Sequence, residues 1–189
     1  IDSDDYMETN CLKKVTDICL NENLDALAVC AANVIDNKHI RRFSYPDFGV
    51  LQGRDVMKDV GLQVCVPFTI YRREFLEDNS LKFYEGIFHE DSEFTPRAYY
   101  FAERVSSIND ILYFVNQNPT SITRTVNPKK SFDTIEVCNS LSEFSTSILP
   151  EYKIKFDNII STNINSALYN SFEMNRGDKD KLNNIIYEN

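Results

Sequence analysis

The chain has 189 residues, a formal net charge of −9 and a 42% share of hydrophobic residues, which is typical of one globular domain or of one domain with a small appendage. Its basic residues never cluster beyond pairs such as Arg41-Arg42, which argues against a nucleic-acid partner, and no run approaches the ~18 apolar residues of a transmembrane segment, which leaves only peripheral membrane contact open. The five cysteines form no C-x-x-C pair, so a disulfide framework and a zinc site are poorly supported and a reducing cytoplasm is expected.

The first part of the chain alternates between helix and strand patterns. Apolar residues at helical spacing predict a helix over 8–22, and the apolar run DALAVCAANV predicts a buried strand over 25–34. The segment 36–50 contains a proline and a glycine and predicts a loop or an irregular hairpin. A short helix is expected at 52–59, and the stretch LQVCVPFTIYRREFLEDN then predicts a strand-like run, with an edge or bend at Pro67, followed by a short helix.

The remaining predicted elements lead to a helical end of the chain. In order, they are an extended segment at 83–88, a helix at 92–103, two short strands at 104–108 and 111–117, and a loop at 118–130. From residue 131 the pattern is helical, with Gly177 separating a short last helix. The sequence therefore predicts an α/β fold for about two thirds of the chain, followed by a helical tail.

A first acidic cluster opens the chain, in the stretch IDSDDYM. On an extended backbone Asp2 and Asp4 would point to the same side, and two such hard carboxylates suit Mg²⁺ or Mn²⁺. A metal held there could bind a diphosphate, which an acidic protein would otherwise repel. The alternative interpretation is structural, because acidic residues also favour the positive N-terminal end of a helix.

A second acidic cluster lies in the stretch EGIFHEDSEF at 85–94. Gly86 permits a sharp turn, and His89, Glu90 and Asp91 then lie directly before a predicted helix. Backbone N–H groups can hold a carboxylate at such a place, where it can act as a general base toward a substrate hydroxyl. The structural alternative is again helix capping, and a single histidine such as His89 is more often structural than catalytic.

Taken in order, the two clusters and their neighbours resemble glycosyltransferase family 2, and within it the bacterial enzymes that build capsule, exopolysaccharide or lipopolysaccharide chains. The matching stretches span residues 1 to about 125 and are IDSDDYM at 1–7, YRREFLEDNSLKF at 71–83, YEGIFHEDSEFTP at 84–96 and ILYFVNQNPTSITRT at 111–125. The Asp-x-Asp stretch alone is weakly specific, whereas the whole set in this order is a specific signature.

The resemblance implies a GT-A-like nucleotide-diphospho-sugar transferase domain. It implies an inverting transfer of a sugar from a nucleotide-sugar donor to a glycan or lipid-linked acceptor, in cell-surface polysaccharide synthesis. Asp2 and Asp4 match the motif that meets the donor and its divalent metal, Mn²⁺ or Mg²⁺, with Asp4 as the more direct ligand. Asp91 matches the family's general base, and Glu90 and His89 lie beside it.

In that family the strands that hold the nucleotide precede the Asp-x-Asp motif, and this chain starts at the motif. The resemblance therefore implies a C-terminal fragment, with the acceptor-side part of the domain at 1–125 and a helical appendage at 126–189. Such a fragment is expected to be inactive by itself. It is also expected to form a homodimer, or to rearrange near 25–34, because a bare sheet edge would otherwise be exposed. The parent enzyme would be cytoplasmic or peripheral to the inner membrane.

One departure from the family lies after the second late strand, where related sequences often carry arginines. Gln117 and Asn118 stand there, and Arg124 is the nearest cation, so how the donor phosphates would be held from that side stays open. Ser121 and Thr123 are loop residues that could also close over a substrate. The rival hypothesis is a non-catalytic glycan- or protein-binding module, in which the carboxylates only cap helices.

Overall fold

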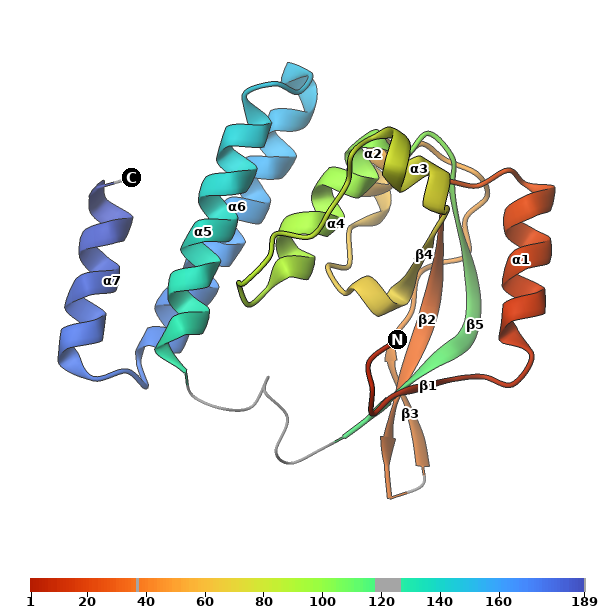
Figure 1. Cartoon of the computed structure of the whole chain (residues 1–189), viewed down its shortest axis with the longest axis horizontal. Coiled ribbons are helices and arrows are strands. Elements are labelled where there is room, and N and C mark those ends of the chain that lie inside the picture. Colours follow the sequence, from red (N-terminus) through yellow and green to blue (C-terminus); the bar gives the residue numbers. More distant parts are fainter. Residues whose placement is uncertain (37, 118–126, 189) are drawn as a thin grey trace. The chain divides into compact units, whose positions relative to one another are not determined.

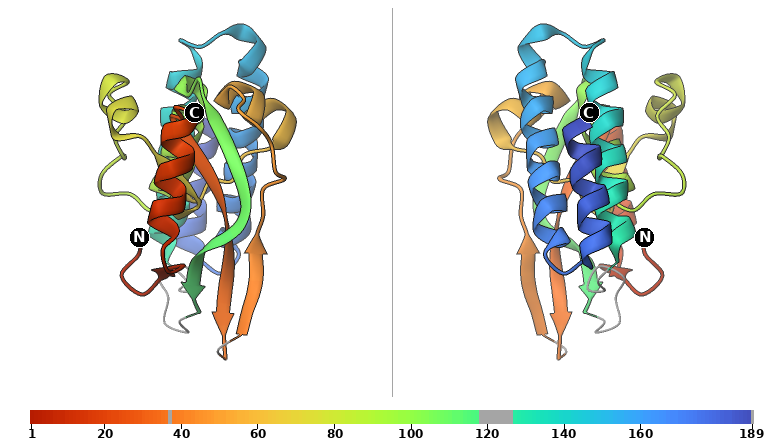
Figure 2. Two further views of the ribbon diagram at one scale, coloured as in Figure 1. Left: turned by 90° about the vertical axis from the view of Figure 1, so that its right-hand side faces the viewer. Right: turned by 90° about the vertical axis from the view of Figure 1, so that its left-hand side faces the viewer.

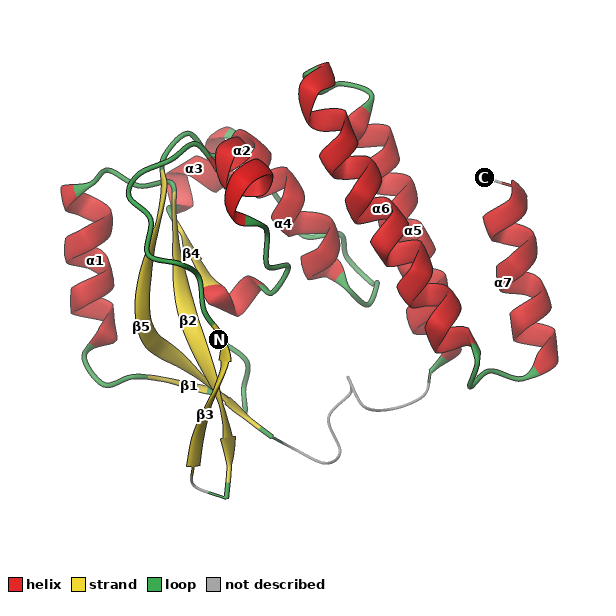
Figure 3. Ribbon diagram, turned by 180° about the vertical axis from the view of Figure 1, so that it is seen from behind, coloured by secondary structure: helices red, strands yellow, loops and turns green. Residues whose placement is uncertain are grey.

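The computed structural model describes residues 1–36, 38–117 and 127–188, and the chain divides into two compact units. The first unit comprises Ile1–Lys82 and Thr95–Ser121, and the second comprises Phe83–Phe94 and Ile122–Asn189. All strands of the described residues belong to the first unit, and the second is helical (Figures 1 and 3). This agrees with the predicted α/β pattern followed by helices.

The strands of the first unit form one mixed five-stranded sheet among the described residues (Figure 1). At its centre β2 (Ala26–Ile35) runs parallel to β5 (Val105–Asn116). The two-residue strand β1 (Tyr6–Met7) pairs antiparallel with the outer side of β5. On the other side of β2, β3 (Lys38–Phe43) and β4 (Thr69–Tyr71) both pair antiparallel with it. The sheet thus places the end of β5 beside the residues that follow the acidic opening.

The central strand β2 consists of small and branched apolar residues because both of its faces are covered. Every residue from Ala26 to Ala32 is at most 1% exposed, as is typical of a strand buried on two faces. This confirms the strand predicted from DALAVCAANV. The chain then returns as β3, with His39 opposite Val34. The first part of the segment 36–50 is therefore the second strand of a hairpin with β2, and residues 44–50 form no strand.

The helix α1 (Cys11–Asn21) covers one face of the sheet and confirms the helix predicted over 8–22 (Figures 1 and 2). Its residues Cys11 and Val15 are buried and belong to one apolar cluster with Leu24, Leu27, Val29 and Leu112. Burial of this apolar surface contributes roughly 25 cal/mol of free energy per Å² and so stabilises the packing of the helix on β2 and β5. Met7, at the end of the opening stretch, also packs against this cluster.

The strand β5 is continuous, which corrects the prediction of two short strands at 104–108 and 111–117. Its pairing register with β2 skips Asn109 and Asp110, so the strand bulges at these residues instead of ending there. The Asp110 carboxylate forms an ion pair of 2.6 Å with Lys14 of α1. The polar residues that suggested a turn therefore mark a β-bulge.

Short elements connect β3 to the helix α4 (Glu90–Phe101). Apart from β4, they are α2 (Gly53–Asp55), the π-helical turn η1 (Val56–Val60), the 3-10 helix η2 (Val66–Phe68) and α3 (Arg73–Asp78). They confirm the short helix expected at 52–59, the bend at Pro67 and the helix that follows. Glycine is required at Gly53, because a Cβ atom there would lie 2.1 Å from the carbonyl oxygen of Tyr99 in α4.

The second unit contains three long helices, α5 (Pro128–Ser145), α6 (Pro150–Ser171) and α7 (Arg176–Glu188) (Figure 2, right). They share a core of Ile135, Ala167, Met174 and Leu182, which confirms the predicted helical tail. Gly177, however, lies inside α7 rather than before it. The helix can begin ahead of the glycine because the Asn175 side chain accepts a hydrogen bond of 3.0 Å from the Asp178 N–H group, which caps the first turn.

The helix predicted at 92–103 is α4, which begins two residues earlier, at Glu90. The segment 83–88, predicted to be extended, contains a turn at Glu85 and Gly86. Residues 118–126 of the predicted loop lie outside the described residues. None of the described helices is long and apolar enough to cross a membrane.

Candidate active site

The acidic opening forms a turn, which corrects the expectation that an extended backbone places Asp2 and Asp4 on one side. The Asp5 N–H group donates a hydrogen bond of 3.1 Å to the Asp2 carbonyl oxygen, and Ser3 and Asp4 lie at the turn. Asp2 and Asp4 are exposed, and Asp5 is partly buried. The Asp-x-Asp motif is therefore an exposed acidic turn directly before β1.

Hydrogen bonds fasten this acidic turn to the end of β5. The backbone N–H group of Asn116 donates to the Asp5 carboxylate over 2.9 Å, and the Asn116 side-chain amide donates to the Asp4 carbonyl oxygen. The Tyr113 hydroxyl accepts from the Asp2 N–H group over 3.0 Å. Burial raises the pKa of Tyr113 most, and the nearby Asp5 carboxylate adds to the rise, so this hydroxyl stays neutral at physiological pH.

The acidic turn offers oxygen ligands without forming a closed cage for a metal. Among the described residues, no group of three or more histidine, cysteine, aspartate or glutamate side chains is placed to hold a metal ion. Mg²⁺ in substrate sites is usually bound by one or two carboxylates, with phosphate oxygens and water completing its shell. The exposed Asp2 and Asp4 fit this open arrangement, in which phosphate oxygens and water would complete the shell.

The second acidic cluster lies at the point where a loop turns into α4. Gly86 and His89 both have left-handed backbones, with φ angles of 82° and 64°, and a positive φ is uncommon for a residue other than glycine. The His89 carbonyl oxygen accepts from the N–H groups of Ser92 and Glu93, over 3.0 and 3.3 Å, which starts the helix. Asp91 therefore stands on a first helical turn whose backbone is tightly determined.

Asp91 differs from its neighbour Glu90 in its surroundings. Glu90 is exposed, whereas Asp91 is partly buried and accepts a hydrogen bond of 2.8 Å from the Ser92 N–H group. Burial raises the pKa of Asp91, and the adjacent Glu90 adds to the rise, while the Ser92 N–H group and His89 oppose it. A carboxylate with a raised pKa is a stronger base at neutral pH, which suits a group that accepts a proton in a reaction.

The raised pKa of Asp91 makes stability depend on pH with a definite sign. The unfolded chain releases this proton near the ordinary value of 3.8, and the folded protein releases it at higher pH, so the folded state binds more protons between the two values. The free energy of unfolding should therefore fall as pH rises through this window. Asp91→Asn should be more stable than the wild type near neutral pH, and the difference should shrink toward the ordinary pKa. Urea unfolding over a pH series measures this, and a variant less stable at neutral pH would contradict it.

The two acidic clusters belong to different units. Asp2, Asp4 and Asp5 lie in the first unit, and His89, Glu90 and Asp91 lie in the second. Within each unit the structure brings the predicted residues together, as one turn and as one helix start. Their joint action on one substrate stays a prediction.

The segment that departs from the family pattern is described only at its beginning. The Gln117 side-chain amide donates to the Asn33 side-chain oxygen over 2.9 Å, which ties the end of β5 to β2. Asn118, Ser121, Thr123 and Arg124 lie outside the described residues, and so do the roles considered for them.

His39, which belongs to none of the sequence motifs, lies beside β1 and β5. Its Nε2 atom is 3.2 Å from the Tyr6 hydroxyl, and its ring centroid is 4.5 Å from that of Phe114. Tyr6 in turn stacks on Phe114, with centroids 4.9 Å apart. The strand register that joins these rings could not be read from residues so far apart in the sequence.

The sequence matches no protein-family model and no curated protein. Among solved structures, it is similar to S. aureus TarS. The crystal structure of TarS 1-349 in complex with UDP-GlcNAc matches with a TM-score of 0.61 and 20% identity, covering 94% of this chain and 49% of that one. The complex of TarS 1-349 with UDP matches with a TM-score of 0.65 and 18% identity, covering 98% of this chain and 52% of that one.

This chain spans about half the length of the TarS structures that it matches. The likeness includes nearly the whole of this chain and is a likeness of fold. It confirms the predicted α/β class, and the chain has a glycosyltransferase-like fold.

Proposed function

We propose that the protein is a family 2 glycosyltransferase, which transfers a sugar from a nucleotide-sugar donor to a glycan or lipid-linked acceptor in cell-surface polysaccharide synthesis. The observation that carries the proposal is Asp91, a partly buried carboxylate of raised pKa at the start of α4, in a glycosyltransferase-like fold. TarS, which shares this fold, was crystallised with UDP-GlcNAc and with UDP, and this supports a nucleotide sugar as the donor.

The proposed reaction is a single inverting displacement. Asp91 accepts the proton of an acceptor hydroxyl while the hydroxyl oxygen attacks the anomeric carbon of the donor sugar. The bond from this carbon to the nucleoside diphosphate breaks, and its electron pair leaves with the diphosphate oxygen. The left-handed His89 and the hydrogen bonds to its carbonyl oxygen hold Asp91 in place for the transfer.

The acidic turn is assigned to the donor. Asp4, with Asp2, would hold a divalent metal, Mg²⁺ or Mn²⁺, together with the donor diphosphate. Such a metal would offset the negative charge that grows on the leaving diphosphate. Asn116 and Tyr113 keep the turn in shape, because they bind its backbone groups and leave the Asp4 carboxylate exposed.

Asp4→Asn should weaken metal-dependent donor binding. The substitution keeps the shape of the side chain but removes a charged oxygen ligand. We expect a loss of affinity at least as large as the roughly 10–100-fold that removal of an outer-shell partner of a metal site costs. Calorimetry of UDP-sugar binding to the full-length protein, with and without Mn²⁺, measures the effect.

Asp17→Asn is the matched control for this experiment, since it removes an exposed carboxylate of the same unit on α1. It should leave donor affinity unchanged. If Asp4→Asn binds the donor as tightly as Asp17→Asn does in Mn²⁺, the assignment of the acidic turn is wrong.

The test of the proposed function is release of nucleoside diphosphate by the full-length protein, in the presence of UDP-sugars and a panel of glycan or lipid-linked acceptors. Release that depends on both substrates is the expected result. Binding of a glycan without any turnover over the whole panel would favour the non-catalytic module instead. The acceptor, homodimerisation and peripheral membrane contact stay predictions of this proposal.

A further inference from the structure

The loop that leads to Asp91 is held by side chains of α5, which lie far from it in the sequence. The Phe88 backbone N–H group donates a hydrogen bond of 2.7 Å to the carboxylate of Asp133, 45 residues away. Lys129 Nζ, one helical turn before Asp133, donates to the Gly86 carbonyl oxygen over 3.0 Å and lies 5.4 Å from the centroid of the Phe88 ring. The backbone is thus fixed on both sides of Ile87.

Lys129 and Asp133 form one charged pair in this contact. Lys129 Nζ lies 2.5 Å from Asp133 Oδ2, the same oxygen that accepts from the Phe88 N–H group, and Asp133 is only 6% exposed. Hydrogen bonds with a charged partner are roughly twice as strong as neutral ones. The Asn127 side chain accepts from the Lys129 N–H group over 3.0 Å, which determines where α5 begins and therefore where Lys129 lies.

A second contact with α5 lies on the other side of Asp91. Glu93 is 2% exposed, and its carboxylate accepts a hydrogen bond of 2.8 Å from the Ser140 hydroxyl of α5. Between these two contacts stands His89, whose left-handed backbone is costly for a residue other than glycine and persists only where its surroundings determine it. The same helix therefore holds the chain before and after Asp91.

We propose that Lys129 and Asp133 are positioning residues, which hold the loop at 85–89 so that Asp91 is presented to the acceptor hydroxyl. The inference rests on the proposed function, because it concerns the group proposed as general base. A general base must come within hydrogen-bond reach of the proton, and a misplacement of about 1 Å can cost about 10²-fold in rate. On this proposal α5 contributes to catalysis by positioning Asp91, in addition to packing against the other helices.

The first test compares turnover of Asp133→Asn and Lys129→Met with that of the wild type, in the full-length protein. We expect kcat to fall by roughly 10- to 10²-fold, with the donor KM changed by less than about twofold, because the donor is bound elsewhere. Lys129→Arg keeps a cation for Asp133 and should restore most of the rate. Lys153→Met is the matched control, since it breaks another Lys–Asp pair at i,i+4 spacing, on the exposed face of α6.

The pH profile gives a readout that a purely structural role would not change. A loosened loop admits water to Asp91, so its pKa should return toward the ordinary value, and the acidic limb of the kcat profile should move to lower pH in Asp133→Asn. An unchanged profile, with kcat per folded molecule like that of Lys153→Met, would overturn the inference.

Hydrogen exchange over 83–91 separates this inference from the proposed function. In Asp133→Asn the Phe88 amide should exchange faster by on the order of 10-fold, because its hydrogen bond to a charged carboxylate becomes a weaker one to a neutral amide oxygen. A wild-type protein without turnover would overturn the proposed function, and the exchange result would then decide whether Lys129 and Asp133 hold the loop. Unchanged exchange would show that they do not.

Discussion

Asp91→Asn should reduce turnover by about 10²–10⁴-fold, the usual cost of losing a general base, while leaving donor affinity nearly intact. The amide keeps the shape of the side chain and can still accept the 2.8 Å hydrogen bond from the Ser92 N–H group, so the start of α4 is preserved. It cannot accept a proton from the acceptor hydroxyl. Nucleoside diphosphate release and calorimetric donor binding, measured on the same full-length protein, separate the two effects.

Glu151→Gln is a suitable control, because Glu151 is also an acidic residue in the first turn of a helix of the same unit, and it is exposed. It should keep wild-type turnover. The helix-capping interpretation makes the opposite prediction, namely that both variants lose only a little stability and no rate. Near-normal turnover of Asp91→Asn would therefore reject this base assignment and make His89 or Glu90 the next candidate.

The elements with strong local patterns were predictable from the sequence. The apolar stripe of α1 and the apolar run of β2 predict burial directly, because a helix or strand with such a pattern is stable only when its apolar side chains are packed away from water. The bulge in β5 was not predictable, because Asn109 and Asp110 have the composition of a turn and only pairing with β2 shows that the strand continues. The start of α7 before Gly177 depends in the same way on the cap made by Asn175.

The residues of the candidate site were predictable from the sequence, but the distant side chains that hold them in place were not. The candidate residues within 2–5 and 89–91 stand in short motifs, so their grouping can be read from the sequence. The contact from Asp133 to the Phe88 N–H group joins residues 45 positions apart and leaves no local pattern. The turn at the acidic opening depends likewise on Asn116, which lies at the end of a distant strand. Motifs thus indicate the chemistry, whereas the side chains that hold the motifs in place can be identified only from the three-dimensional structure.

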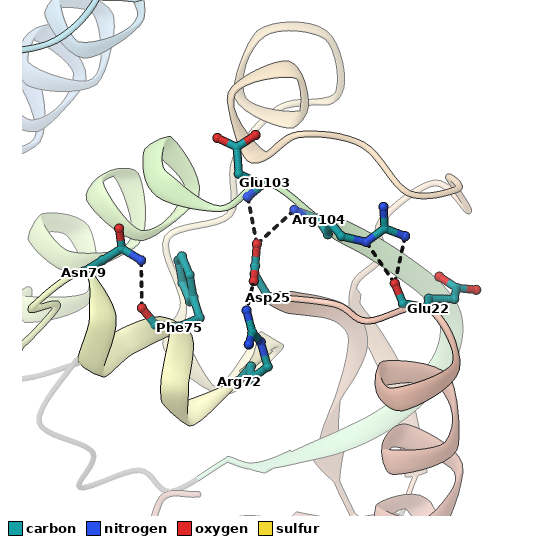
Figure 4. A network of polar contacts seen from close by, with 7 residues as sticks. All are labelled: Glu22, Asp25, Arg72, Phe75, Asn79, Glu103 and Arg104. Atoms are coloured by element: carbon teal, nitrogen blue, oxygen red, sulfur yellow. Dashed lines mark hydrogen bonds and ion pairs between the residues drawn. The ribbon is translucent and has the colours of Figure 1, made fainter.

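Asp25→Ala should cause a large loss of stability in the first unit. Asp25 is 7% exposed, and its carboxylate accepts from the backbone N–H groups of Glu103 and Arg104 over 2.8 and 3.1 Å (Figure 4). The other oxygen forms a 2.5 Å ion pair with Arg72, which is partly exposed. Alanine leaves two N–H groups without an acceptor, and each such group costs about 1–3 kcal/mol when it stays buried.

The expected loss in the free energy of unfolding is therefore about 2–5 kcal/mol for Asp25→Ala, and less for Asp25→Asn, which keeps an acceptor oxygen. Asp110→Ala is the control, because it breaks an exposed ion pair with Lys14 that should contribute under about 1 kcal/mol. The sequence has no tryptophan, so urea unfolding is best followed by circular dichroism. The network joins the start of β2, the residues after α4 and the residue before α3, so its loss should loosen these three segments together.

If Asp25→Ala lowers the free energy of unfolding by no more than Asp110→Ala does, the Asp25 carboxylate does not hold these elements together.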